Sequence, residues 1–154
     1  MIKKIALFFV LALSASVRAD SPKDKGWEEF KDGYMGFAIS LPIAWKSDIH
    51  GGSTYFRPPK SSRGVAVLGE YSWEDFPGGQ ASCNKATLPG VAVYDCPSIE
   101  KLACDHVYFI PQAHLIIGDE IQSPTSKKMV GSFRLFKEDT AQPSAPADAI
   151  SERR

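Results

Sequence analysis

The chain lacks an excess of charge of either sign. Its 154 residues carry 18 basic and 18 acidic side chains, so the formal net charge is zero. Without Lys3, Lys4 and Arg18, which lie in a segment that we expect to be removed, 15 basic residues remain against 18 acidic ones. Proteins that bind nucleic acid typically carry a basic excess, and we therefore expect no nucleic-acid partner.

Recognised catalytic and cofactor-binding motifs are also absent. The sequence contains no G-x-S-x-G elbow, no Walker loop and no dinucleotide fingerprint. Adjacent acidic pairs within the predicted domain are Glu28-Glu29, Glu74-Asp75 and Asp119-Glu120. Neighbouring side chains on a strand point to opposite faces, so we expect these pairs to be solvated and not to converge as acid and base. The sequence thus predicts no catalytic residue and no cofactor, and it favours a non-catalytic protein over an enzyme.

Long apolar runs are missing except at the N-terminus. Residues 5–13 are uninterruptedly apolar, they follow two lysines, and Val17-Arg18-Ala19 then places small residues at a cleavage position. A membrane span needs about 20 apolar residues, so this run is too short to be one. We predict a signal peptide over residues 1–19, cleaved after Ala19, which directs the chain to the periplasm or the outside medium. No membrane span is expected after cleavage.

Cysteine is scarce, with Cys83, Cys96 and Cys104 alone. In an oxidising compartment this number predicts one disulfide and one free thiol. All three pairings are open, and we favour a bridge that includes Cys83, because its irregular surroundings most need one. A Cys83–Cys96 bridge would stabilise the fold by about 3 kcal/mol. A zinc site with His106 does not fit the ligand spacing of known zinc modules, and we expect no metal.

The clearest structural signal is the segment 36–45. Its large apolar residues alternate with small or polar ones, and they are Phe37, Ile39, Leu41, Ile43 and Trp45. Strict alternation predicts a strand with one buried face, and Pro42 marks its end or an edge position.

Further elements follow from local signals. We expect strands at 53–57, 65–71, 91–94 and 133–136, a hairpin over 106–118, and loops at 46–53 and 74–90. Trp27 and Phe30 belong to a helical turn or a short strand. Ser123-Pro124 predicts a helix start, with Met129, Val130 and Phe133 on one side and an end near Gly131.

These elements amount to five to seven strands and one or two short helices. We therefore predict an α+β fold, a single domain over residues 26–137 with the helices packed on a mostly antiparallel sheet. An all-β sandwich is the alternative. Residues 20–25 are expected to be a flexible lead-in, and the Ala-, Pro- and Ser-rich residues 138–154 a disordered tail.

Both ends of the predicted domain resemble PsbP-like domains. The matching residues at the start are Tyr34, Gly36, Phe37, Pro42 and Trp45, and those at the end are Ser132, Phe133 and Phe136. The resemblance covers about a third of the chain. It implies an α/β/α sandwich around an antiparallel sheet and a non-catalytic binding or assembly role, and it transfers no functional residue.

Candidate binding residues are aromatic and arginine side chains near the predicted loops, which are the types that dominate protein interfaces. We select Arg57, Tyr55, Trp73 and His50. The expected function is a secreted or periplasmic binding protein, such as an inhibitor, an immunity protein or an assembly factor. Its protein partner would contact the 46–53 and 74–90 loops.

Two other functions remain open. A small periplasmic hydrolase would need a cysteine thiolate within hydrogen-bond reach of His106 or His114, and a third group to orient the imidazole. A small-ligand carrier would need a deep apolar pocket between the sheet and a helix. The sequence does not indicate an oligomeric state.

Overall fold

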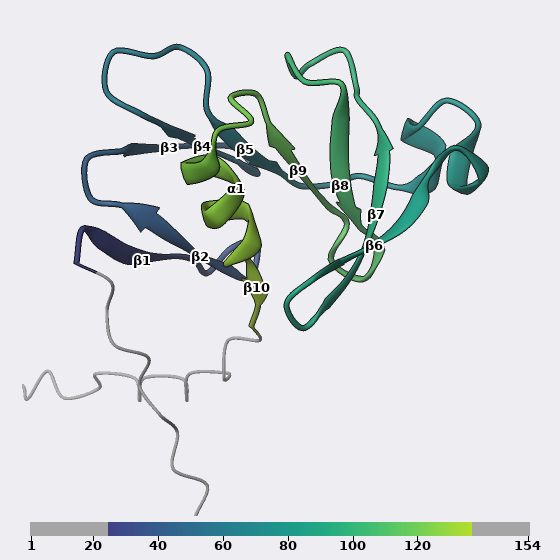
Figure 1. Ribbon diagram of the computed structural model, residues 1–154. Helices are drawn as coiled ribbons and strands as arrows, with labels where there is room; N and C mark the ends of the chain where they lie inside the picture. The colour runs from purple at the N-terminus through teal and green to yellow at the C-terminus, as the bar shows by residue number, and fades with distance from the viewer. Residues whose placement is uncertain (1–24, 137–154) are drawn as a thin grey trace, which may run out of the picture.

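The computed structural model describes residues 25–136. The predicted signal peptide, the predicted tail and all but the last residue of the predicted lead-in lie outside the described residues. The described chain forms a three-stranded and a seven-stranded antiparallel sheet with one short α-helix (Figure 1). The predicted α+β class is confirmed.

The seven-stranded sheet consists of two meanders that meet where β5 pairs with β9. Its order is β3 (Lys46–His50), β4 (Ser53–Arg57), β5 (Val65–Leu68), β9 (Leu115–Asp119), β8 (His106–Ile110), β7 (Val91–Pro97) and β6 (Asn84–Leu88). The predicted hairpin over residues 106–118 is confirmed as β8 and β9, which the short 3₁₀ turn η3 (Pro111–Ala113) connects.

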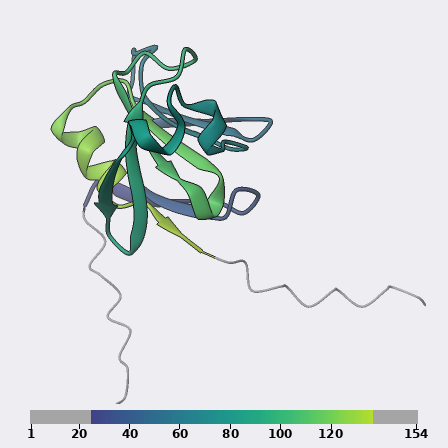
Figure 2. The same ribbon diagram turned by 90° about the vertical axis from the view of Figure 1, so that its right-hand side faces the viewer.

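The three-stranded sheet has the order β1 (Trp27–Asp32), β2 (Phe37–Pro42) and β10 (Arg134–Leu135). The helix α1 (Pro124–Gly131) contacts β2 of this sheet and β9 of the larger one (Figure 1). Two 3₁₀ turns, η1 (Trp73–Asp75) and η2 (Gly79–Ser82), lie on the other side of the large sheet, and Figure 2 turns them toward the viewer. The large sheet is therefore covered on one face by α1 and the small sheet, and over part of the other face by these turns.

Each face of the large sheet has its own apolar core. The core on the α1 side joins the two sheets and the helix, and its most buried large side chains are Phe37, Phe56, Phe133, Ile39, Ile110, Leu115, Ile117 and Met129. The core on the η1–η2 side contains Leu68, Phe76, Cys96, Leu102, Val107, Phe109 and Ile116. Alternation along β5, β8 and β9 sends successive side chains into the two cores, which explains why these strands are apolar on both faces.

The strand β2 confirms only part of the predicted alternation. Phe37, Ile39 and Leu41 are buried, but Ile43 is 61% exposed and Trp45 is partly buried at the rim of the core. The strand ends at Pro42, and the Trp45 amide donates to the Pro42 carbonyl oxygen at 2.8 Å. The chain turns there, so the residues beyond Pro42 no longer follow the period of the strand.

The predicted loops at 46–53 and 74–90 were partly wrong, because each contains a strand. The strands β3 and β6 lie at the two edges of the large sheet, where most side chains are exposed and polar, so no apolar alternation marks them. Gly51 and Gly52 take positive φ angles of 44° and 76° and connect β3 to β4 by a two-residue turn. Including β1, the strand count therefore exceeds the predicted five to seven.

The predicted helix is confirmed from its cap to its end. Ser123 is the N-cap, and its hydroxyl oxygen accepts a hydrogen bond from the Ser126 amide at 3.1 Å. Met129 and Val130 are buried, and the helix ends at Gly131.

A buried polar contact joins the two sheets. Asp32 at the end of β1 is 5% exposed, and its carboxylate accepts hydrogen bonds from the Thr54 hydroxyl of β4 at 2.8 Å and from the Met35 amide at 2.9 Å. Both carboxylate oxygens thus have donors, which offsets the cost of burying them.

Gly64 is expected to tolerate no side chain. A Cβ atom there would overlap with the carbonyl oxygen of Phe56 on the neighbouring strand β4. We expect Gly64→Ala to lower the free energy of unfolding by about 1–3 kcal/mol, because the backbone must shift to make room. Urea unfolding followed by tryptophan fluorescence measures this loss. Gly131→Ala is the control, since nothing lies within 4 Å of a Cβ there and alanine favours a helix by up to about 1 kcal/mol. Equal unfolding midpoints for the two variants would contradict the close approach.

Candidate functional site

The first candidate surface lies at the β3 edge of the large sheet. β3 pairs with β4 on one side and has no strand on its other side among residues 25–136, and all five of its residues are exposed. An edge strand of this kind presents backbone N–H and C=O groups that can pair with another strand.

Side chains of β3 and β4 form an ordered group at this edge. Arg57 Nη1 donates to Asp48 Oδ2 at 3.1 Å, and the guanidinium carbon lies 5.0 Å from the centre of the Tyr55 ring. His50 Nε2 lies 3.6 Å from Asp48 Oδ1. The structure therefore brings together three of the four predicted binding residues. We define the edge patch as Lys46, Asp48, His50, Tyr55 and Arg57.

The edge patch and the loop after it are electropositive. Lys46 is the direct cross-strand partner of Arg57, so the two cations point to the same face. Lys60 and Arg63 follow in the loop after β4, and both are exposed. Asp48 is the acidic side chain among these residues, and sequence reasoning missed it because the segment that holds it carried no strand signal.

Trp73 does not join the edge patch. It lies in η1, and its indole packs edge-on against the rings of Tyr94 and Phe109, with centroid distances of 4.7 and 4.8 Å. These contacts place Trp73 against the core on the η1–η2 side. The 74–90 segment, which we expected to contact the same partner, contains β6, the strand at the opposite edge of the sheet from β3.

The second candidate surface is a cavity of about 290 Å³ between α1 and strands β7, β8 and β9. Leu88, Ile117 and Val130 supply apolar lining, and the polar side chains around it are Asp95, His106, Tyr108, Asp119, Gln122 and Lys127. We call it the sheet–helix pocket. Its position is the one that the small-ligand alternative requires.

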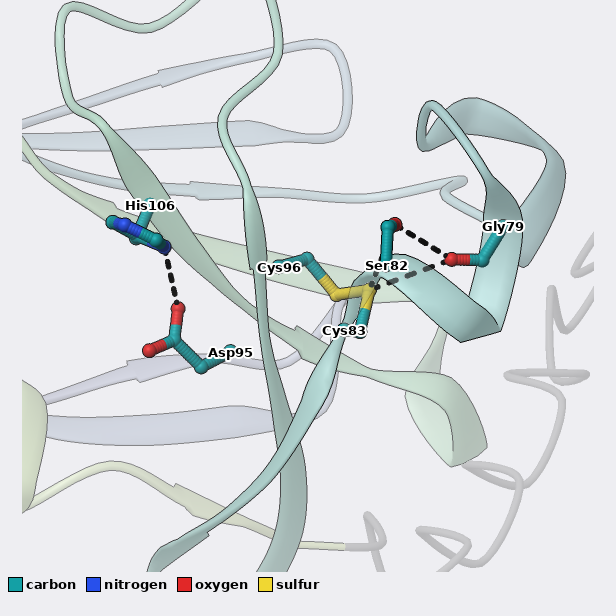
Figure 3. Close-up of a disulfide and its surroundings, with 6 residues drawn as sticks. All are labelled: Gly79, Ser82, Cys83, Asp95, Cys96 and His106. Carbon is teal, nitrogen blue, oxygen red and sulfur yellow. Dashed lines mark hydrogen bonds and ion pairs between the residues drawn. A yellow bond between two sulfur atoms is a disulfide. The ribbon is translucent and has the colours of Figure 1, made fainter.

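Cross-strand register brings the polar groups of this pocket together. Tyr108 of β8 pairs directly with Asp95 of β7 and with Ile117 of β9, so the three side chains form a row on the face below α1. His106 lies two residues before Tyr108 and shares this face. Its Nδ1 atom is 3.0 Å from Asp95 Oδ1 (Figure 3). His106 is the first residue of β8 and lies at the end of the strand away from the hairpin turn.

Asp95 Oδ1 is shielded from solvent, yet no described donor meets it with hydrogen-bond geometry. His106 Nδ1 lies 3.0 Å from this oxygen, but its direction is not that of a hydrogen bond. The contact is therefore attractive when the imidazole is protonated, and it leaves Oδ1 without a well-directed donor.

Asp119 is already engaged within the protein. Its Oδ1 accepts from the amides of Ile121 and Gln122 at 3.0 and 2.8 Å, and its Oδ2 accepts from the Ser126 hydroxyl at 2.7 Å. Its neighbour Glu120 accepts from the amides of Gly64 and Ala103. The expectation that this acidic pair is merely solvated was wrong, because both carboxylates hold loop backbone in place. Neither is thereby available as a principal ligand-binding group.

The disulfide joins Cys83 and Cys96 (Figure 3). The favoured choice of a bridge that includes Cys83 is confirmed, and the bond links β7 to the residue just before β6. Cys96 follows Asp95 on β7, so the two side chains point to opposite faces of the sheet. The disulfide thus anchors β7 on the face of the sheet opposite the sheet–helix pocket, and the neighbouring Asp95 lines that pocket.

The cysteine–histidine arrangement of a hydrolase does not form among the described contacts. Cys104 is free and half-buried, and its Sγ lies 3.6 Å from the Ser98 hydroxyl. Burial raises the pKa of the Cys104 thiol and so disfavours the nucleophilic thiolate. His114 Nδ1 lies 3.1 Å from the Tyr71 carbonyl oxygen instead. Within residues 25–136 no three potential metal-ligating side chains lie close enough to hold an ion.

Comparison with protein-family models, with curated proteins and with solved structures found no match. The resemblance to PsbP-like domains stays a prediction. The one α-helix of the described residues is too short to cross a membrane. The disulfide is typical of proteins that fold in an oxidising compartment.

Proposed function

We propose that this chain is a secreted or periplasmic, non-catalytic protein that binds a protein partner through the edge patch. The observation that carries this proposal is an edge strand exposed along its whole length beside an ordered arginine–tyrosine–aspartate group. Strand addition at such an edge gives affinity through backbone hydrogen bonds and specificity through the alternating side chains.

The charge of the edge patch indicates the chemistry of the partner segment. In the edge patch and the loop that follows β4, the cationic side chains of Lys46, Arg57, Lys60 and Arg63 are opposed by Asp48 alone. An extended segment that carries acidic side chains would complement this charge and associate faster at low salt. Arg57 is held in place by Asp48 and Tyr55 before binding, so less side-chain entropy is lost when the complex forms.

The proposed location has two supports. The Cys83–Cys96 disulfide favours an oxidising compartment, and the N-terminal sequence predicts a cleaved signal peptide. An inhibitor, an immunity protein or an assembly factor of the periplasm or the outside medium fits this description, and the identity of the partner decides among them.

Arg57→Ala is expected to weaken partner binding at least tenfold, because interface arginines held beside an aromatic ring are typical hot spots. The partner is first captured from periplasmic and secreted fractions with the tagged mature domain. Its affinity for the purified domain is then measured by surface plasmon resonance. Lys85→Ala, an exposed lysine on the opposite edge strand β6, is the matched control and should leave the affinity unchanged.

Hydrogen exchange of the complex gives an independent test of strand addition. The β3 amides that face away from β4 should exchange more slowly in the complex than in the free domain, because they gain hydrogen-bond partners. Protection confined to another surface, together with unchanged affinity of the Arg57→Ala variant, would overturn the proposed function.

A further inference from the structure

The sheet–helix pocket holds opposite charges on its two walls. Asp95 and Tyr108 come from the strands β7 and β8, and Lys127 comes from α1. The remaining titratable groups around it are His106, which lies beside Asp95, and Asp119, which is engaged by backbone amides and by Ser126. A ligand in this pocket therefore meets an anionic group on one side and a cationic group on the other.

Asp95 is prepared to accept a hydrogen bond. Its carboxylate lines the pocket and its side chain is 41% exposed, so it can accept a charge-assisted hydrogen bond from a ligand that supplies an N–H group. The Tyr108 ring is its direct cross-strand neighbour, and the face of an aromatic ring also attracts a cation. Both features favour an ammonium group at this wall.

Lys127 supplies the opposite charge. Its side chain is exposed at the mouth of the pocket, and no described acidic side chain forms an ion pair with it. An ammonium group without an ion-pair partner favours a ligand carboxylate over a second cation.

The apolar lining and the size limit the rest of the ligand. Leu88, Ile117 and Val130 present aliphatic side chains to the cavity, and all three residues are buried. A volume of about 290 Å³ lies at the lower end of the range for ligand pockets, so the occupant is small.

We propose that the sheet–helix pocket binds a small zwitterionic molecule of the amino-acid class with an apolar side chain. The ligand ammonium group donates to Asp95, its carboxylate faces Lys127, and its side chain packs on Leu88, Ile117 and Val130. This site is separate from the edge patch, and the proposal does not depend on the protein-binding function.

Isothermal titration calorimetry of the mature domain tests the proposal with three probes that share the isobutyl group. Leucine carries both charges, isoamylamine carries the ammonium group alone, and isocaproate carries the carboxylate alone. We expect leucine to bind at least tenfold more tightly than either single-charge probe. Absence of leucine binding, or equal affinities for leucine and isoamylamine, would overturn the proposal.

Variants assign the two charges. Asp95→Asn and Lys127→Ala should each weaken leucine binding about tenfold, and Lys127→Ala should leave the affinity for isoamylamine unchanged. Lys128→Ala removes the same charge from the same helix, but the Lys128 ammonium lies 4.7 Å over the Trp27 ring and does not line the pocket. It should leave leucine binding unchanged. Lys127 is an exposed helix position, so Lys127→Ala is expected to keep the fold. It therefore still tests the proposal if Asp95→Asn perturbs the fold. Equal leucine binding by the wild type and Lys127→Ala would contradict the assignment.

Discussion

Replacement of both Cys83 and Cys96 by serine is expected to lower the free energy of unfolding by about 3 kcal/mol. The bridge spans a sequence separation of 13, and cross-linking a loop of this length restricts the unfolded chain by about that amount. Small domains are stable by about 5–15 kcal/mol, so the loss is a large share of the total. Urea unfolding of the oxidised wild type and of the double variant, followed by tryptophan fluorescence, measures the difference.

Two controls separate the disulfide from the loss of cysteine itself. Cys104→Ala removes the free, half-buried thiol and should cost much less than the double substitution. A reducing agent should lower the stability of the wild type toward that of the double variant and leave the double variant unchanged. If reduction leaves the unfolding midpoint of the wild type where it was, the bridge does not stabilise the fold.

The disulfide also has a local effect that hydrogen exchange can resolve. Cys96 lies in the core on the η1–η2 side, and the adjacent Asp95 faces the sheet–helix pocket. Loss of the disulfide loosens the connection between β6 and β7. It is therefore expected to increase the mobility of Asp95, the anionic group of the pocket, because Asp95 is the sequence neighbour of Cys96. Faster exchange of the β7 amides in the double variant is the expected sign of this coupling.

Elements with strong local signals were predictable from the sequence. The helix α1 was recognised from Ser123-Pro124 because the cap hydroxyl and the fixed φ angle of proline act within a single turn. The β8–β9 hairpin was recognised because two apolar runs flank a short turn. Neither prediction needed information about residues far away in the chain.

The edge strands and the pocket were not predictable in the same way. β3 is exposed throughout, so its sequence shows no alternation of apolar and polar residues. It forms a strand because the two-glycine turn pairs it with β4. The contact between Asp95 and His106 arises because β7 and β8 pair in a register that places Pro97 opposite His106 and Tyr108 opposite Asp95. That register is determined by packing and turn geometry, and it cannot be derived from the spacing of residues along the chain.

Phe37→Ala is expected to lower the free energy of unfolding by about 3–5 kcal/mol, the largest effect that we predict. The Phe37 side chain is fully buried, and its ring stacks on Phe133 with a centroid distance of 5.4 Å. Truncation removes the buried ring and leaves a cavity between the small sheet and the end of α1, where the surrounding strands can close only in part. Urea unfolding should show a lower midpoint with an unchanged denaturant dependence.

The neighbouring aromatic residue provides the control, since Tyr34 is 83% exposed in the turn before β2. Tyr34→Ala should change the stability by no more than about 0.5 kcal/mol, as surface substitutions usually do. Phe37→Leu should fall between the two, because it keeps part of the buried volume. The same cavity removes support from the end of α1, the helix that carries Lys127, so we also expect faster amide exchange along α1 in Phe37→Ala. Equal losses for Phe37→Ala and Tyr34→Ala would mean that β2 does not pack against the helix in this arrangement.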